Sequence, residues 1–302
     1  MDLIPFNDRA AEAGKRLNQM KRLFASCRLC ARECRAKRLR GETGECGLDC
    51  RLLVSSSHLH PGEEPVISGY SGSGTVFFSG CNLACLFCQN YPISQLKTGI
   101  CESVKQVAER FIKIQELRAH NLNIVTPTPQ LKGIFEALIL AWKDGLSLPI
   151  AYNCGGYESV EALQILDGLV DIYLTDFKYG NDKVGKVSGI PDYFTKASAA
   201  IKEMQRQVGE LQIDDRGIAV QGLIIRHLIL PEGQSATTEV MRFLKDEIGA
   251  GVYISLMSQY YPSYKARSHP ALKRHIDRGE YREARDIMKK LGFENGWVQP
   301  SP

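Results

Sequence analysis

Short apolar runs alternate with longer amphipathic stretches from residue 75 to the end of the chain. The runs are bounded by glycine, proline or polar residues, which is typical of buried strands. The stretches between them repeat apolar residues at helical spacing. We therefore expect strands at 75–79, 122–125, 149–153, 171–175, within 218–230 and at 252–256, and helices at 102–118, 130–143, 158–167, 192–209, 235–247 and 279–291.

Single strands separated by helices predict βα units and a parallel sheet. Six strands are too few for a closed eight-stranded barrel. The pattern therefore predicts an α/β protein whose core is an open, partial (βα)6 TIM-like barrel. No G-x-G-x-x-G opens a helix after the first strand, which argues against a Rossmann dinucleotide site.

The first 70 residues follow a different pattern. Residues 9–25 predict an amphipathic helix, and a cysteine-rich stretch follows it. Residues 51–74 are rich in glycine and proline and are expected to be loop-like. We therefore predict a small cysteine-rich, metal-binding extension over residues 1–70 and a main domain, including the C-terminal helix, over residues 71–302.

The composition is that of an ordinary globular protein, with 44% hydrophobic and 24% charged residues in 302. No apolar run is long enough for a membrane span, and the N-terminus lacks the basic start and apolar core of a signal peptide. We therefore expect a cytoplasmic protein with no membrane partner.

The net charge of +4 is concentrated in the extension, because residues 1–51 hold twelve Lys and Arg against seven Asp and Glu. Such a segment can bind nucleic acid, dock an acidic partner or neutralise an anionic metal–thiolate centre. A solvated charged face is the commonest explanation, so nucleic-acid binding is not expected.

Nine of the ten cysteines lie between residues 27 and 101, at spacings that are typical of metal ligands. Cys81, Cys85 and Cys88 form a C-x3-C-x2-C motif directly after the first strand. Three thiolates can bind three irons of a 4Fe-4S cluster and leave the fourth iron open to a small molecule. A structural zinc site would need a fourth ligand; the nearest candidates are Cys101, which is poorly spaced, and the upstream His58 and His60.

An earlier group of cysteines, Cys27, Cys30, Cys34 and Cys46, supplies four more thiols, with Cys50 to spare. Four thiolates at this spacing suit tetrahedral zinc. They suit a second 4Fe-4S cluster about as well. We therefore predict a second metal site in the extension, with zinc and iron–sulfur both open.

Polar residues follow the predicted strands, where the active groups of parallel α/β barrels gather. Beyond the cysteine motif they are Thr126, Thr128, Asn153, Asp176, Lys178, Arg226 and His227. Any one Asn, Thr or Ser in such a place can simply cap the next helix, and Lys178 can simply pair with Asp176. Their succession around one cysteine loop favours a shared site.

The cysteine motif, with Phe87 before its last cysteine, resembles that of the radical S-adenosylmethionine (SAM) superfamily. Four segments narrow the resemblance to the branch related to pyruvate formate-lyase activating enzymes. They are Gly-Ser-Gly-Thr-Val-Phe-Phe-Ser-Gly-Cys at 72–81, Asn-Ile-Val-Thr-Pro-Thr at 123–128, Asp176-x-Lys178, and Arg-His-Leu-Ile-Leu-Pro at 226–231. The resemblance extends from about residue 27 to the end of the chain.

This resemblance implies an iron–sulfur oxidoreductase with a radical SAM core. The three cysteines of the motif would bind a 4Fe-4S cluster, and a reductant such as flavodoxin or ferredoxin would reduce it. The reduced cluster would cleave SAM to a 5′-deoxyadenosyl radical that abstracts hydrogen from a substrate. In related activating enzymes, the substrate is a glycine of a partner protein.

The resemblance also implies contacts with SAM. Thr126 and Thr128 stand where many members have the Gly-Gly-Glu that holds the SAM amino group, and the glutamate is absent here. Asn153 and Asp176 would hydrogen-bond SAM or a nearby cation, and Lys178 would pair with the SAM carboxylate. The residues that would face SAM or substrate are Arg226 and His227.

Two functions therefore compete. The leading hypothesis is a radical SAM enzyme. The alternative is a metal-stabilised binding protein that uses its basic extension to bind RNA or an acidic partner, with zinc at both cysteine sites. Metal content separates the two, whereas no residue outside the cofactor set identifies a substrate.

Overall fold

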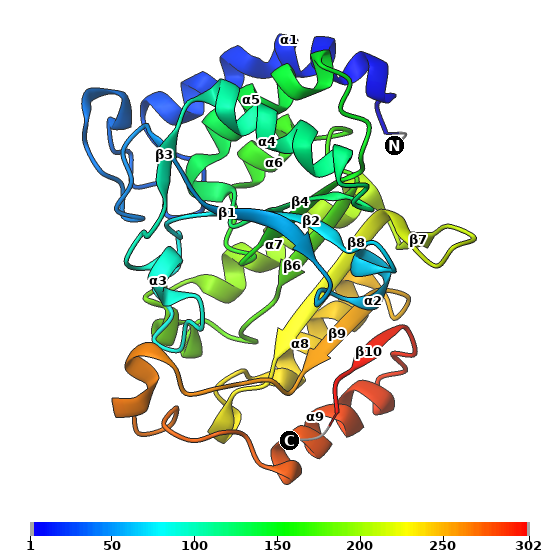
Figure 1. Cartoon of the computed structure of the whole chain (residues 1–302). Coiled ribbons are helices and arrows are strands. Elements are labelled where there is room, and N and C mark those ends of the chain that lie inside the picture. Colours follow the sequence, from blue (N-terminus) through cyan, green and yellow to red (C-terminus); the bar gives the residue numbers. More distant parts are fainter. Residues whose placement is uncertain (1–2, 301–302) are drawn as a thin grey trace.

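A ten-stranded sheet organises the computed structural model, which describes residues 3–300 (Figure 1). Six neighbouring strands are parallel, and they correspond to the six predicted strands. They are β2 (Ser73–Phe78), β4 (Leu122–Val125), β5 (Ile150–Cys154), β6 (Ile172–Asp176), β8 (Ala219–Leu228) and β9 (Tyr253–Met257). The strand order β10-β9-β8-β6-β5-β4-β2-β1-β3 has two free ends, so the partial barrel is open, as predicted.

The edges of the sheet carry strands that the hydrophobic pattern did not predict. β1 (Leu52–His60) pairs antiparallel with β2, and β3 (Ile100–Glu102) pairs antiparallel with β1. β10 (Gly296–Val298) adds a parallel strand beside β9, and β7 (Gln212–Ile213) forms a hairpin with β8.

The prediction of a loop-like segment over residues 51–74 is therefore wrong for β1. The strand contains Ser-Ser-Ser-His in its middle and is only partly buried, so it lacks the apolar run of a central strand. It joins the same sheet as the parallel strands. The boundary between extension and main domain near residue 70 stays a prediction.

Helices cover the sheet and enclose the larger hydrophobic core. α1 (Phe6–Ala25), within the predicted extension, packs against α5 and α6. The other helices are α4 (Val104–Glu116), α5 (Leu131–Lys143), α6 (Val160–Ile165), α7 (Tyr193–Val208), α8 (Thr237–Phe243) and α9 (Arg278–Lys290), with two one-turn helices, α2 (Pro65–Ser68) and α3 (Tyr91–Ser94).

A smaller apolar cluster lies near the amino ends of the parallel strands. α2 contributes Val66 and Ile67 to it, and they pack with residues such as Ile172 and Ile224 from β6 and β8. The Asn121 side chain, just before β4, donates a hydrogen bond to the Ile67 carbonyl at 2.8 Å. The connection between β1 and β2 thus closes this end of the sheet.

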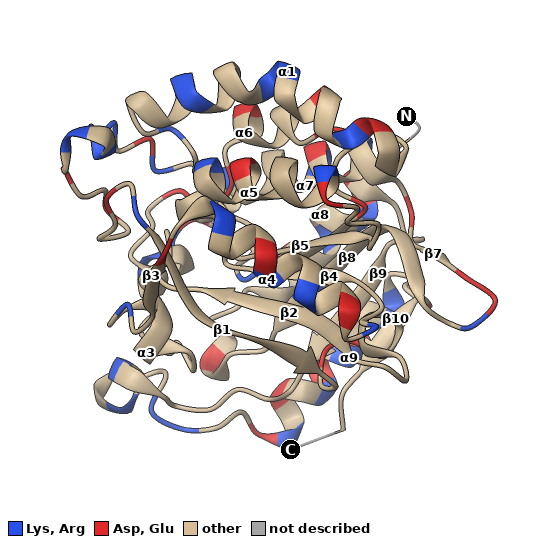
Figure 2. Ribbon diagram, turned by 45° about the horizontal axis from the view of Figure 1, so that its top comes forward, with Lys and Arg blue, Asp and Glu red and all other residues tan. Residues whose placement is uncertain are grey.

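Charged residues lie on the helices and loops and are almost absent from the parallel strands (Figure 2). Within the bounds of those six strands, the only Lys, Arg, Asp or Glu residues are Asp176 and Arg226. Asp176 ends β6 and is the register partner of Arg226 in β8. The sheet therefore places two opposite charges side by side at its carboxyl end.

Candidate functional site

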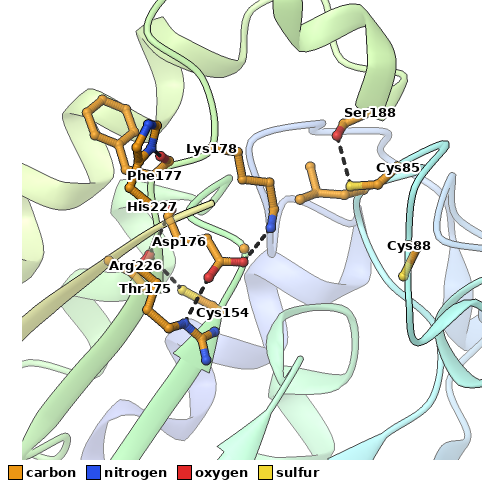
Figure 3. A network of polar contacts seen from close by, with 12 residues as sticks. Cys85, Cys88, Cys154, Thr175, Asp176, Phe177, Lys178, Ser188, Arg226 and His227 are labelled. Carbon is orange, nitrogen blue, oxygen red and sulfur yellow. Dashed lines mark hydrogen bonds and ion pairs between the residues drawn. The ribbon is translucent and has the colours of Figure 1, made fainter. Parts of the chain in front are cut away.

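The cysteine loop lies at the carboxyl end of β2 and is held in place by a segment far along the chain. The Ala84 and Leu86 amides donate to the carbonyls of Ser188 and Val187, each at 2.9 Å. Cys85 is buried and accepts a hydrogen bond from the Ser188 hydroxyl at 2.8 Å (Figure 3). The other side of the loop is closed by aromatic rings, because Phe87 packs against Tyr260 and Tyr91 stacks on Tyr264.

The three thiols of this loop are the donor set that a 4Fe-4S cluster takes. Cys81 and Cys88 are partly exposed, and Cys88 lies 3.0 Å from the Ser94 hydroxyl. Burial raises the pKa of the Cys81 and Cys85 thiols, so ligand formation must release their protons. A 4Fe-4S cluster binds each of three thiolates to a different iron.

A charged network faces the cysteine loop (Figure 3). Asp176 pairs with Lys178 and accepts a 2.9 Å hydrogen bond from Arg226 Nε. Arg226 also donates to the Asn153 side chain at 2.6 Å. Burial favours the neutral form of Asp176, but Arg226 and Lys178 outweigh it and keep the pKa of the carboxyl below its ordinary value. Four of the residues predicted from strand ends therefore meet in one place.

Lys178 lies between the network and the cluster loop, as Figure 3 shows. Burial opposes its charge, but Asp176 and the Cys85 thiol raise the pKa of the ammonium to about 12. Lys178 is therefore charged at neutral pH. A largely buried, charged ammonium beside the cysteine loop suits an anionic group such as a carboxylate.

The two threonines after β4 have separate environments. Thr126 is partly exposed and has a positive φ of 57°, and its amide donates to the Asn153 carbonyl. Thr128 is buried, and its hydroxyl donates to the Glu158 carboxylate at 2.8 Å. Tyr152 donates to the same carboxylate at 3.1 Å, and burial raises the pKa of Glu158 to about 7. Thr126 thus adjoins the charged network, whereas Thr128 is engaged elsewhere.

His227 is separated from the network although it follows Arg226. Side chains alternate across a strand, so the imidazole lies on the opposite face of β8. It is fully buried, with Nδ1 2.6 Å from the Phe177 carbonyl and Nε2 3.0 Å from the Thr237 hydroxyl. Burial lowers the pKa of His227 to about 4. The structure therefore does not bring His227 together with the other predicted cofactor contacts.

Several polar residues of this site were not singled out from the sequence. Ser94 and Ser188 contact cluster-loop thiols from separate segments, and no local spacing marks them. Glu63, from the connection after β1, lies 3.5 Å from Arg226. The only sequence feature that could have indicated Glu63 is the pair of adjacent glutamates shortly before the first predicted strand.

The cysteines of the extension form a second group. Cys27, Cys30, Cys34 and Cys46 line one small cavity. A Cβ atom placed on Gly44 would come within 3.3 Å and 3.4 Å of the Sγ atoms of Cys34 and Cys46, so glycine keeps the cradle open. The donor set therefore fits a thiolate-bound metal or cluster.

Two further residues connect this cavity to its surroundings. The buried Arg38 donates to Cys27 Sγ at 3.7 Å and to the Pro129 carbonyl at 2.6 Å, which places a positive charge beside the thiols. Asn82 also lines the cavity, and it directly follows Cys81 of the other group. The two cysteine groups are therefore neighbours, with Asn82 between them.

The remaining cysteines lie outside both groups. Cys50 and Cys101 are exposed, and Cys154 is buried with its thiol 3.3 Å from the Thr175 hydroxyl. No helix within residues 3–300 is long and apolar enough to cross a membrane.

Comparison with known proteins places this site in a family. The model of the Radical SAM superfamily matches residues 75–209. The uncharacterized protein MJ0674 of Methanocaldococcus jannaschii is 34% identical over 285 residues, which cover 91% of this chain and 77% of the relative. A second uncharacterized protein of that organism, MJ0808, is 23% identical and covers 81% of this chain and 73% of its own length.

Among solved structures, native anSMEcpe with bound AdoMet is similar, with a TM-score of 0.45 and 12% identity. The match covers 76% of this chain and 58% of that one. A hexahistidine-tagged form of the same protein matches with a TM-score of 0.43.

The chain belongs to the radical SAM superfamily and is a radical SAM enzyme. This membership implies a 4Fe-4S cluster and SAM as cofactors, and a reductant such as flavodoxin or ferredoxin. The matched segment contains the cysteine loop, Asn153, Asp176 and Lys178.

Proposed function

We propose that this enzyme uses SAM to abstract a hydrogen atom from a partner protein, with a backbone glycine as the target. The observation that carries this proposal is the cysteine loop at the end of β2, which faces the network of Asp176, Lys178 and Arg226. The resemblance to activating enzymes of glycyl-radical proteins supplies the class of substrate.

The residues of the site have separate tasks in this proposal. Cys81, Cys85 and Cys88 hold the cluster, which together with SAM supplies the hydrogen-abstracting radical chemistry when bound. Lys178 pairs with the SAM carboxylate, because its ammonium is charged and lies next to the cysteine loop. Asp176 holds Lys178 in place.

Three further residues complete the cofactor site. Arg226 fixes Asp176 and Asn153 through its two hydrogen bonds. Asn153 and Thr126 lie at neighbouring strand ends and are joined by a backbone hydrogen bond. Their oxygen atoms can accept hydrogen bonds from the SAM amino group. Thr128 and Glu158 form a buried pair behind them that fixes the turn after β4.

We also propose that Cys27, Cys30, Cys34 and Cys46 hold a second metal centre, either zinc or a 4Fe-4S cluster. Its support is the shared cavity and the buried Arg38 beside it. Metal analysis of anaerobically purified protein decides between the two, because two clusters require about eight irons per chain and the mixed case about four irons and one zinc.

The decisive experiment is anaerobic reconstitution followed by dithionite and SAM. The enzyme is expected to release 5′-deoxyadenosine. A fully loaded cluster that releases none would contradict the proposed chemistry. Glycine as the target is tested separately, by electron paramagnetic resonance of candidate partner proteins labelled with 2-deuterated glycine, in which the doublet splitting of a glycyl radical must collapse.

A further inference from the structure

The connection between β1 and α2 carries two adjacent carboxylates into the interior of the open barrel. Glu63 and Glu64 directly precede α2, whose Val66 and Ile67 close the amino end of the sheet. Glu64 is 8% exposed, although a glutamate in a loop would ordinarily lie in solvent. The fold therefore holds two acidic groups next to the smaller apolar cluster.

Glu63 links this connection to the charged network. Its carboxylate accepts a 3.2 Å hydrogen bond from the Asn123 side chain and lies 3.5 Å from Arg226. Burial raises the pKa of Glu63, and the nearby Glu64 adds to that effect while Arg226 opposes it. Arg226 is thus shared among Asp176, Glu63 and the nearby Glu64.

Two buried oxygen atoms in this region have no hydrogen-bond partner. They are Oε2 of Glu64 and Oδ1 of Asn123, and the Asn123 residue is completely buried. An unsatisfied buried acceptor is costly, and a carboxylate oxygen more so than an amide oxygen. Of the two glutamates, Glu63 has contacts with Asn123 and Arg226. The interior therefore lacks hydrogen-bond donors for these two oxygen atoms.

Part of this network is accessible to solvent. The exposed fractions of the side chains are 10% for Glu63, 16% for Arg226 and 17% for Asp176. A group with several N–H donors suits the acceptors of Glu63, Glu64 and Asn123.

We propose that Glu63, Glu64 and Asn123 form a substrate subsite that binds an ammonium or guanidinium group below the SAM-binding network. This subsite builds on the function proposed above and adds a chemical class to it. The substrate carries a cationic side chain or amine, which enters the barrel from its carboxyl end. Glu64 accepts from that group, and Glu63 orients it while keeping its contact with Arg226.

The test compares Glu64→Gln with Glu136→Gln in the full chain. Glu136 is a matched control, because it is a partly exposed glutamate paired with Lys132 on α5. The probes are propylammonium and propylguanidinium, with propionamide as the neutral comparison. Their affinity is measured by the shift in melting temperature of the reconstituted enzyme, with and without SAM.

Both cationic probes are expected to stabilise the native enzyme and the Glu136→Gln variant, and propionamide is not. Glu64→Gln should weaken probe binding at least about tenfold, since it replaces the unpaired carboxylate oxygen with an amide. If Glu64→Gln binds the probes as tightly as the native enzyme, or if propionamide stabilises the enzyme as much as they do, Glu64 does not select a cation and the subsite is refuted. Competition between SAM and the probes would assign the carboxylates to the cofactor and would also overturn the subsite.

A second measurement separates binding from a structural role. If Glu64 is there to bind a cationic substrate, Glu64→Gln leaves the stability of the free protein unchanged or raises it, because a buried carboxylate oxygen without a hydrogen-bond partner is removed. If Glu64 only neutralises Arg226, the same variant is less stable, and the subsite fails. Release of 5′-deoxyadenosine is measured in the same samples, so that a failure of the radical chemistry is distinguished from a failure of the subsite.

Discussion

The two ends of the parallel sheet differ in how completely their buried charged groups are paired. At the amino end, the buried Arg9 donates hydrogen bonds to both oxygens of Asp171, at 2.8 Å and 2.7 Å. The Ile150 amide donates a third hydrogen bond to the same carboxylate, at 2.7 Å. At the carboxyl end, Arg226 is shared among several carboxylates, and the Glu64 oxygen remains unpaired.

This difference separates stability from function. Arg9 joins α1 of the extension to the start of β6, and the polar groups of this ion pair are matched within the protein. The carboxyl end leaves polar groups partly exposed and unmatched, as expected where ligands bind. Substitutions at the amino end should therefore change unfolding, and those at the carboxyl end should change cofactor chemistry.

The largest expected effect is at the cysteine loop. Cys85→Ser should abolish SAM cleavage, because the cluster loses one of its three protein ligands. Release of 5′-deoxyadenosine and iron content after anaerobic reconstitution measure the loss. Cys154→Ser is the control, since Cys154 lies at the same end of the sheet but outside both cysteine groups. Native iron content and activity in Cys85→Ser would refute the ligand assignment.

At the opposite end, Arg9→Ala should lower the free energy of unfolding by about 3–5 kcal/mol, because it leaves the Asp171 charge buried without its partner. Denaturant titration measures this loss. The folded fraction should still cleave SAM. Arg9→Met combined with Asp171→Leu should recover much of the stability, and a loss below about 1 kcal/mol in Arg9→Ala would mean that this pair does not anchor the extension.

Within the charged network, Lys178→Met should weaken SAM binding about 100-fold, or about 2.7 kcal/mol, by removing one partner of a buried charge pair. Equilibrium binding of SAM to the reconstituted enzyme measures the change. Lys186→Met is the control, because Lys186 is exposed on the segment that supports the cysteine loop. Unchanged SAM affinity together with lower stability would show that Lys178 only forms a structural ion pair with Asp176.

The smallest expected effect concerns His227. Its pKa is about 4 in the folded protein and about 6.5 in the unfolded chain, so between these values only the unfolded chain binds the proton. Stability should therefore fall by about 2 kcal/mol from pH 7 to pH 5 on account of this residue, and no further below about pH 4.

Denaturant titrations at pH 7 and pH 5 measure this slope. His227→Gln should flatten it, whereas the exposed His275→Gln should leave it as in the native protein. An equal slope in His227→Gln and the native enzyme would place the acid sensitivity elsewhere. This outcome would show that protonation of His227 does not set the acid sensitivity of the sheet.

Much of the architecture could be predicted because its signals are local. The six parallel strands follow from short apolar runs, and the three cysteines are close enough in the chain for their spacing to define a ligand set. β1 was missed because a partly exposed strand near a sheet edge lacks the apolar run of a central strand.

The site was only partly predictable for a related reason. Asn153, Asp176, Lys178 and Arg226 could be named because strand ends of a parallel sheet meet at one edge. That rule cannot distinguish the two faces of a strand, so it also selected His227, which lies on the other face. It selected Thr128 as well, which is engaged by Glu158.

The sequence by itself determined the order of strands and helices, the cysteine spacing and the residues at the strand ends. These features depend on neighbours along the chain, whose spacing is fixed by helix and strand periodicity. Only the tertiary structure decided that Glu63 and Glu64 lie beside Arg226, and that Asn82 lies between the two cysteine groups. Those contacts join segments that are distant in sequence, and they depend on how the sheet curves and how its end is closed.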